Sequence, residues 1–161
     1  MISAGCAVAA DTKLETPEGP MAIRAAAGKA IAVFTRDPRG RTRFRMMHDV
    51  RRVAEQQPVL AIKLENGAVF RVGPEQVLYV AGMIERRADA LHAGDALEPI
   101  FHYPTDYQYR DDIHGGERTS TASLRIVALE TGGAADLYAL RVHPTGCFFV
   151  TAGVLCKADG A

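Results

Sequence analysis

The sequence lacks the features that commit a chain to a disulfide-bonded, zinc-stapled or membrane-spanning class. It has no tryptophan and three cysteines in 161 residues. Cys6, Cys147 and Cys156 are too few and too irregularly spaced for a disulfide framework or a zinc knuckle. This use of cysteine favours a reducing compartment, and hence the cytoplasm. No apolar run has the pattern of a signal peptide or the length of a membrane span, so we expect no membrane partner.

The chain also lacks a dominant charge. Its 19 Lys and Arg residues balance 19 Asp and Glu residues, so no global field recruits nucleic acid. The composition is that of a globular protein, with 48% hydrophobic residues and with glycine and proline scattered as punctuation. A chain of this length buries roughly 70% of its unfolded surface, which is enough for a core. We predict one domain over residues 1–161.

Apolar residues recur mostly at every second position, which predicts strands. Clear examples are 61–64, 68–72 and 137–142. Asn66-Gly67 separates the first two, and both residue types tolerate the positive φ of a type I′ hairpin turn. We expect the strand after this turn to break near Gly73-Pro74, because proline lacks the N–H that a central ladder needs. Further turn signals lie at close intervals: 16–19, 37–40, 93–95 and Gly132-Gly133. An all-β domain of short antiparallel strands is the fold class that this pattern predicts.

Helical signals are few. Single turns are expected at 23–27 and 87–92, and 51–57 fits either a helix or a strand. The segment 99–123 has little periodicity, and we predict a surface loop or excursion there. Its imidazoles and carboxylates match no compact ligand spacing, so no metal site is predicted. These residues are His102, Asp106, Asp111, Asp112 and His114.

A basic run is the clearest charge feature. On a strand, Arg41, Arg43 and Arg45 would place three guanidinium groups on one face. Such stripes commonly protect a sheet edge from pairing with another chain. The alternative is an acidic protein partner, which we favour over a phosphate backbone because the chain as a whole is neutral.

Three blocks, in order, resemble the Hint domains of inteins and hedgehog-type autoprocessing proteins. Residues 11–19 are similar to the opening of intein-like domains, where a nucleophile precedes a Thr, an apolar strand and a Pro-x-Gly turn. Residues 67–76, followed by the Leu-x-x-Gly-Asp of 91–95, resemble the block whose centre is normally Thr-x-x-His. Residues 137–157 resemble the closing pair of strands. The resemblance implies a flat, horseshoe-shaped β fold with pseudo-twofold symmetry, whose first and last strands bring the chain ends together in one cleft.

The resemblance also implies a chemistry. In the family a Cys or Ser at the domain start attacks the preceding carbonyl, which requires a nucleophile, a general acid or base for the amide nitrogen, and oxyanion donors. Here the candidate is Cys6, acting on the Gly5-Cys6 bond. Family members place the nucleophile five residues before the Thr of the first block, and five before Thr12 is Ala7. Either one residue is inserted, or the nucleophile is gone and Cys6 is a small buried apolar side chain.

The other two motifs are altered as well. Thr-x-x-His aligns with 73–76, so Gln76 stands in place of the histidine. A glutamine forms hydrogen bonds but transfers no proton at neutral pH, and loss of a general acid costs roughly 10²–10⁴ in rate. Splicing domains end in Val-His-Asn where this chain has 156–158, Cys-Lys-Ala, so Asn cyclisation is excluded there. The resemblance puts Cys156 beside the first strand, where it would form a redox pair with Cys6 or simply pack.

The sequence therefore predicts a degenerate, non-splicing Hint-like domain that serves as a structural or binding module, as one part of a larger assembly. An alternative is a cysteine-dependent self-cleaving domain acting at Gly5-Cys6. A third is an unrelated β domain that binds an acidic partner through its arginines. None of the three requires a cofactor.

Overall fold

The computed structural model describes residues 5–99, 108–110, 117–119 and 124–160, with side chains placed in the first and last of these ranges. The described chain is mostly β, as predicted. The strands are β1 (Val8–Ala9), β2 (Lys13–Thr16), β3 (Gly19–Ala22), β4 (Ala32–Arg36), β5 (Thr42–Leu64), β6 (Val69–Val72), β7 (Val77–Val80), β8 (Ile84–Arg87), β9 (Ala96–Leu97), β10 (Gln108–Arg110), β11 (Glu117–Thr119), β12 (Leu124–Val142), β13 (Cys147–Phe149) and β14 (Leu155–Lys157). The helices are α1 (Ile23–Ala26) and the 3₁₀ helix η1 (Ala88–Ala90).

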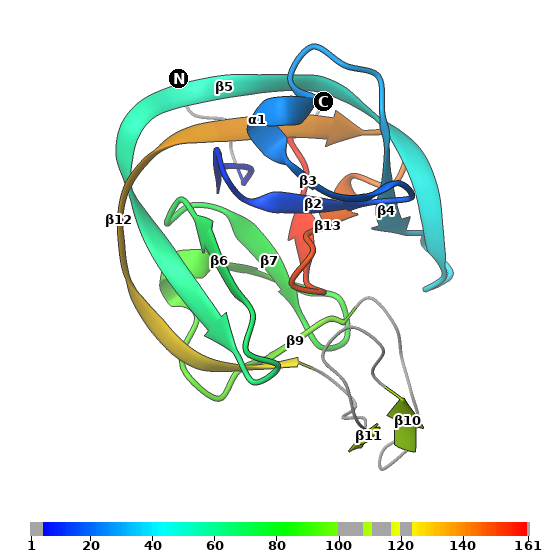
Figure 1. Cartoon of the computed structure of the whole chain (residues 1–161), viewed down its shortest axis with the longest axis vertical. Coiled ribbons are helices and arrows are strands. Elements are labelled where there is room, and N and C mark those ends of the chain that lie inside the picture. The colour runs from blue at the N-terminus through cyan, green and yellow to red at the C-terminus, as the bar shows by residue number, and fades with distance from the viewer. Residues whose placement is uncertain (1–4, 100–107, 111–116, 120–123, 161) are drawn as a thin grey trace.

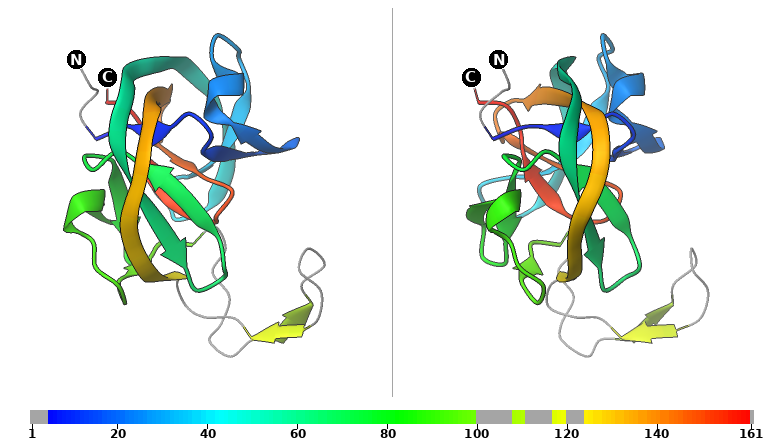
Figure 2. Two further views of the ribbon diagram at one scale, coloured as in Figure 1. Left: turned by 60° about the vertical axis from the view of Figure 1, so that its left-hand side comes forward. Right: turned by 90° about the vertical axis from the view of Figure 1, so that its left-hand side faces the viewer.

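Two long strands form the frame of the molecule. β5 has 23 residues and β12 has 19, and they pair antiparallel over most of their length. They bend together into an arch around the shorter strands (Figure 1), and the side views show them next to each other throughout (Figure 2). Register shifts interrupt the ladder, and Asp49 and Gln56 of β5 have φ of 51° and 43°. Such bulges bend a strand, so they let two long strands curve without separating.

The pair Gly132-Gly133 is part of this bending, which corrects the turn predicted there. Both residues lie inside β12, where the register shifts between Thr131 and Ala134. Gly133 has φ of 78°, and a Cβ added to Gly132 would lie 3.0 Å from the backbone nitrogen of Ala61. The two glycines therefore form a bulge within one strand and not a turn between two strands.

Inside the arch, β1 and β6 connect β12 to β5. β1 pairs with β12 on one side and with β6 on the other, while β6 also pairs with β5. Because β5 and β12 pair with each other, these four strands form a closed ring. The other strands of the large sheet continue from β12 in the order β9, β7, β14, β13, with β8 paired to β7, while β4 pairs with the first part of β5.

The predicted hairpin at Asn66-Gly67 is present with a different turn. The Gly67 N–H donates to the Leu64 carbonyl, and the Leu64 N–H donates to the Ala68 carbonyl. Gly67 has φ of 84°, whereas Asn66 is not among the residues with positive φ. A type I turn followed by a left-handed glycine fits this pattern, and a type I′ turn does not.

The short elements follow the predictions closely. Helical turns occur at α1 and η1, and residues 51–57 belong to β5. The predicted break near Gly73-Pro74 is also confirmed, because β6 ends at Val72 and β7 begins at Val77. Most of the segment 99–123 lies outside the described residues. The parts of it that are described include β10 and β11, which pair antiparallel. The loop and the single domain over 1–161 stay predictions.

Residues 6–9 alternate between two core clusters, which lie on opposite faces of this extended segment. Cys6 and Val8 lie in the main cluster, which also holds the fully buried Phe148. Ala7 and Ala9 lie in a smaller cluster on the opposite face. This alternation follows from the period of two along an extended chain, and it decides which side chain can reach which site.

The bulge at Gly132 yields a test. Gly132→Ala should lower the free energy of unfolding by about 1–3 kcal/mol, because the new methyl group meets backbone rather than a movable side chain. Gly160→Ala is the matched control, since its Cβ would meet nothing within 4 Å, and it should change stability by less than about 0.5 kcal/mol. Urea unfolding of both variants measures the difference, and equal stabilities would contradict this account of the arch.

Candidate functional site

Gln76 lies where the two ends of the described chain meet. Its side-chain oxygen accepts the backbone N–H of Ala7 at 2.8 Å. Its side-chain nitrogen donates to the carbonyls of Val77 at 2.8 Å and Lys157 at 3.0 Å. The Val77 N–H donates to the Gly5 carbonyl at 2.9 Å. One amide side chain therefore holds the first residues, the start of β7 and the end of β14 together.

The predicted meeting of the ends is correct, but its means differ from the expectation. β1 pairs with β12 and β6, and β14 pairs with β13 and β7, so the first and last strands are not paired with each other. Gln76 connects the two ends instead. It is fully buried and does not line an open cleft. A buried side chain that has hydrogen-bond partners at both ends is rigidly held.

Gly73 lets the backbone of Ala7 approach this site. The Gly73 N–H donates to the Ala7 carbonyl at 2.7 Å. A Cβ at Gly73 would lie 3.1 Å from the Cβ of Ala7 and 3.3 Å from its carbonyl oxygen. The position that the family fills with threonine therefore has no room for a larger side chain unless Ala7 moves.

The hydrogen bond from Ala7 identifies the peptide bond that the site surrounds. The amide nitrogen bound by Gln76 is that of the Cys6-Ala7 bond, and not that of Gly5-Cys6. This agrees with the spacing, because Ala7 stands five residues before Thr12. Ala7 offers a methyl group, and a methyl group cannot attack a carbonyl.

The thiol of Cys6 belongs to the core. Its side chain is fully buried, and burial raises the pKa of Cys6 from 9.0 to about 12, although hydrogen bonds from the backbone at Leu140 and Asp159 lower it in part. At neutral pH the thiolate, which is the nucleophilic form, is almost unpopulated.

Cys156 lies in the same core cluster. It is fully buried and unbridged, as are Cys6 and Cys147. Burial raises the pKa of Cys156 well above its usual range, and a charge on Cys6 would raise it further. The structure thus brings the predicted pair of thiols into one cluster, while a catalytic role for Cys6, Gln76 or Cys156 stays a prediction.

An ion pair near the end of the chain was missed by the sequence reasoning. Asp159 Oδ2 lies 2.6 Å from Arg51 Nη2 and 3.6 Å from Arg141 Nε. The Asp159 N–H also donates to the Leu140 carbonyl at 2.8 Å. These contacts fix the backbone that covers the Cys6 thiol. Nothing local in the sequence signals them, because the partners are far apart along the chain.

A second missed feature is the carboxylate of Glu75. Its Oε1 is buried without a hydrogen-bond partner and lies 3.1 Å from where a Cβ of Gly73 would stand. An acceptor beside the Cys6-Ala7 bond does not replace the missing imidazole, since no hydrogen bond joins it to the amide nitrogen.

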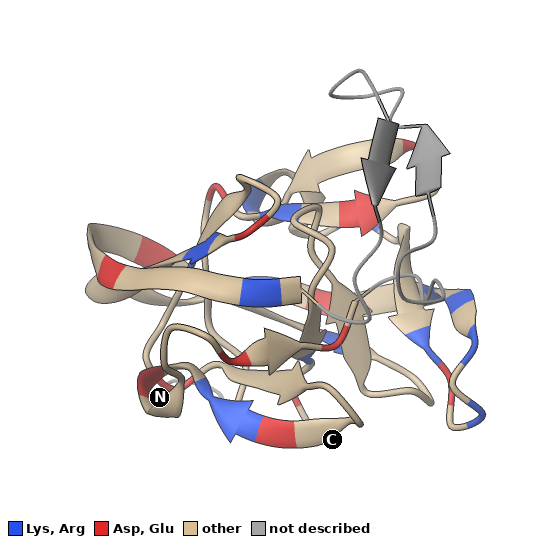
Figure 3. Ribbon diagram, turned by 90° about the horizontal axis from the view of Figure 1, so that it is seen from below, with Lys and Arg blue, Asp and Glu red and all other residues tan. Residues whose placement is uncertain are grey.

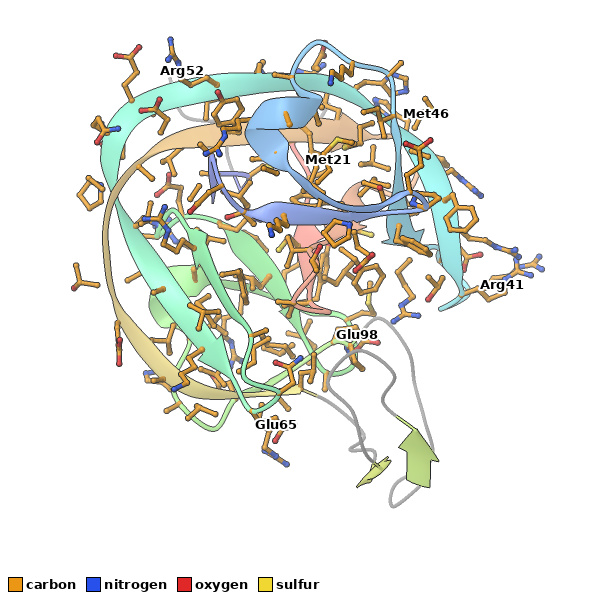
Figure 4. All side chains as sticks on the ribbon, viewed as in Figure 1. Met21, Arg41, Met46, Arg52, Glu65 and Glu98 are labelled. Atoms are coloured by element: carbon orange, nitrogen blue, oxygen red, sulfur yellow. The ribbon has the colours of Figure 1, made fainter. Side chains whose placement is uncertain are left out.

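The three arginines of the predicted stripe lie on the β4–β5 hairpin, where basic residues concentrate (Figure 3). Arg41 Nε and Arg43 Nε lie 3.1 and 3.3 Å from Asp37 Oδ2, and Arg45 donates to the carbonyl of Phe44. The N–H of Arg41 and the neighbouring guanidinium groups lower the pKa of Asp37 to about 2. Arg41 projects outward at the tip (Figure 4), yet part of the stripe's charge is neutralised within the hairpin. An acidic partner stays a prediction.

Among the residues that the structure describes, no group of histidine, cysteine, aspartate and glutamate side chains is arranged to hold a metal ion. The five imidazole and carboxylate residues of 102–114 lie outside the described side chains. Over the same described part of the chain, no helix has the length and apolarity needed to cross a membrane.

Comparison with solved structures establishes the class of fold. The chain aligns with the DnaB intein from Synechocystis sp. at a TM-score of 0.73 and 13% identity, covering 96% of this chain and 99% of that one. The bacterial intein-like domain from Clostridium thermocellum aligns at a TM-score of 0.68 and 18% identity, covering 94% and 98%. The DnaX mini intein from Spirulina platensis aligns at 0.70 and 11% identity, covering 94% and 98%.

The chain therefore has the intein-like Hint fold, as the three blocks predicted. No family model matches the sequence, and no protein of curated function does. At identities this low the likeness concerns the fold, and the activity has to be argued from the site.

The buried thiols predict a particular pH dependence of stability. The folded-state pKa of Cys6 lies above its ordinary value of 9.0, so folding favours the protonated thiol. The stabilisation is complete below pH 9 and is lost as the pH rises toward 12, by up to about 1.4 kcal/mol per pH unit for each such thiol. Urea unfolding at pH 8, 9 and 10 should show a steeper decline for the native chain than for Cys6→Ala. Equal slopes would mean that Cys6 ionises as freely when folded as when unfolded.

Proposed function

We propose that this protein is a degenerate Hint domain that does not splice and that acts as a structural or binding module, as one part of a larger assembly. The observation that carries the proposal is the hydrogen bond from the Ala7 N–H to Gln76 Oε1. It supports an assignment of Ala7 to the nucleophile position and of Gln76 to the position of the general acid. Neither residue has the chemistry of its position.

The arrangement retains binding but omits proton transfer. Gln76 orients the Cys6-Ala7 amide as a histidine would, through one hydrogen bond to its nitrogen. Departure of that nitrogen would require a proton, and a side-chain amide has none to give at neutral pH. The nearest thiol, Cys6, is on the acyl side of this bond and has a pKa of about 12. The site therefore holds a peptide bond in place without breaking it.

Self-cleavage at Gly5-Cys6 is the alternative function. It would require Cys6 to ionise and to attack the carbonyl of Gly5, which accepts a hydrogen bond from the Val77 N–H. That donor would help to stabilise an oxyanion. Against it, the Gln76 side chain binds the next amide nitrogen, and the thiol is fully buried. The geometry supports the degenerate reading over this one.

Fusion of a carrier protein before Met1 tests the proposal directly. We expect no appreciable release of the carrier during a day with dithiothreitol at neutral pH, because a missing general acid alone raises the barrier by about 3–5 kcal/mol. Intact mass measures release. Thiol-dependent release that disappears in Cys6→Ala would establish the self-cleaving alternative, and release that persists in Cys6→Ala would contradict both mechanisms.

A gain-of-function variant tests the assignment of positions. Ala7→Cys combined with Gln76→His should introduce thiol-dependent release at the Cys6-Ala7 bond. The introduced thiolate attacks the carbonyl carbon of Cys6, the C–N bond breaks, the imidazole protonates the leaving nitrogen, and dithiothreitol then displaces the thioester. The released carrier should end at Cys6 by mass.

The single variants are the controls. Ala7→Cys alone should cleave at least tenfold more slowly than the double variant, because it lacks the general acid. Gln76→His alone should not cleave. Release that ends at Gly5 in the double variant would show that the active register is Cys6 and that the assignment is wrong.

A further inference from the structure

A groove of about 820 Å³ lies between β2 and β6, away from the Cys6-Ala7 bond. β2 contributes Lys13 and Glu15 to it, and β6 contributes Val69, Phe70 and Arg71. A site of this size is in the range of those that hold ligands or peptide segments. Because the groove is assembled from a strand edge, the backbone of that edge decides what can occupy it.

The edge of β6 along this groove is open. β6 pairs with β5 over Val69–Val72, but on its other side its register with β1 is limited to Val72 opposite Val8. Among the residues that the structure describes, no strand pairs with 69–71 on that side. An unpaired edge offers N–H and C=O groups to another strand.

The direction of these groups follows from the hydrogen bonds at either end of β6. The Ala68 carbonyl accepts from Leu64 in β5, so even-numbered residues direct their backbone groups toward β5. The Gly73 N–H donates to Ala7, and the Arg71 carbonyl accepts from the Thr12 hydroxyl, so odd-numbered residues point the other way. Val69 lies between these landmarks and therefore directs its N–H and C=O into the groove.

A side-chain hydrogen bond lies at each end of the groove, one between Thr12 and β6 and one between the β5–β6 turn and the β13–β14 turn. Thr12 Oγ1 donates to the Arg71 carbonyl at 2.6 Å, and Asn66 Nδ2 donates to the Ala152 carbonyl at 3.2 Å. The free part of the edge is residues 69–71 of β6, which at roughly 3.3 Å per residue spans about 10 Å. The open edge therefore fits a short strand and not a long one.

The charged side chains of the groove differ in burial and in ion pairing. Asp11 is paired with Arg71 at 2.9 Å, and Lys13 is exposed at the rim. Glu15 is half-buried and has no ion pair with a described residue, and burial raises its pKa. A carboxylate that is partly removed from water and has no ion pair attracts a basic ligand.

We propose that this groove binds a short extended peptide of another protein, which adds a strand to the Val69 edge of β6 and brings a basic side chain to Glu15. The apolar side chains of the peptide then alternate with basic ones, and they pack on Val69, which is 56% exposed. The proposal rests on the binding-module function, for which it names the site and the class of partner.

Titration with three blocked pentapeptides tests this assignment. The probe alternates valine and lysine. The first comparison peptide has glutamate in place of lysine, and the second is the lysine peptide with its central valine N-methylated. By NMR we expect the lysine peptide to shift the amide resonance of Val69 and its neighbours. The glutamate peptide should bind at least threefold more weakly, and the N-methylated peptide at least tenfold more weakly because it lacks a ladder N–H.

Two protein variants distinguish the effect of the Glu15 charge on peptide binding from an effect on folding. Glu15→Gln should weaken the lysine peptide by about threefold to tenfold and leave the glutamate peptide unweakened. Glu18→Gln, an exposed carboxylate in the β2–β3 turn outside the groove, should change neither affinity. An unchanged NMR spectrum elsewhere shows that each variant is folded.

Several results would overturn the proposal: no shift at Val69 at millimolar peptide, equal affinity for the N-methylated peptide, or equal affinities for the two charge types. The outcome is independent of the carrier-release assay. Release without peptide binding removes both proposals, release with binding removes the degenerate assignment alone, and binding failure without release removes the groove alone.

Discussion

The contacts of one buried side chain, Gln76, determine how the ends of this chain are arranged. A primary amide offers one acceptor oxygen and two donor hydrogens, and all three are used here: the oxygen accepts from the Ala7 N–H, and the nitrogen donates to the Val77 and Lys157 carbonyls. β1 and β14 are not paired, so these bonds replace a ladder between the first and last strands. Loss of the side chain would leave a buried N–H unsatisfied, which costs about 1–3 kcal/mol in such sites.

The fold was largely predictable because its signals are local. Alternating runs gave the strands at 61–64, 68–72 and 137–142, and proline chemistry gave the break before β7. The length of β5 and β12 was not predictable in this way, since a bulge keeps two segments in one strand where the sequence shows a turn signal. Gly132-Gly133 has the composition of a turn, and its placement within β12 depends on a partner strand distant in sequence.

The sequence identified the residues of the site but not which peptide bond the site surrounds. The motif alignment identified Gln76, and the spacing from Thr12 pointed to Ala7, while the identity of Cys6 as a thiol pointed to the neighbouring bond. The two faces of β1 resolve the conflict, because Cys6 faces the main core and Ala7 the smaller cluster. No sequence signal reports which amide a distant side chain binds. The ion pair of Asp159 with Arg51 was unpredictable for the same reason.

Packing makes the substitutions at this site depend on one another. A Cβ at Gly73 would lie 3.1 Å from the methyl group of Ala7, so each of these residues is small because the other is close. A threonine at the first position would press on Ala7, and a thiol at the second would overfill a cluster of small residues, at a cost of about 1–3 kcal/mol each. Gln76 imposes no such cost, because it satisfies the same amide nitrogen that a general acid would have to protonate. Stability alone therefore favours keeping this hydrogen bond and opposes a larger side chain at either Gly73 or Ala7, so these positioning contacts persist whether or not the site carries out any chemistry.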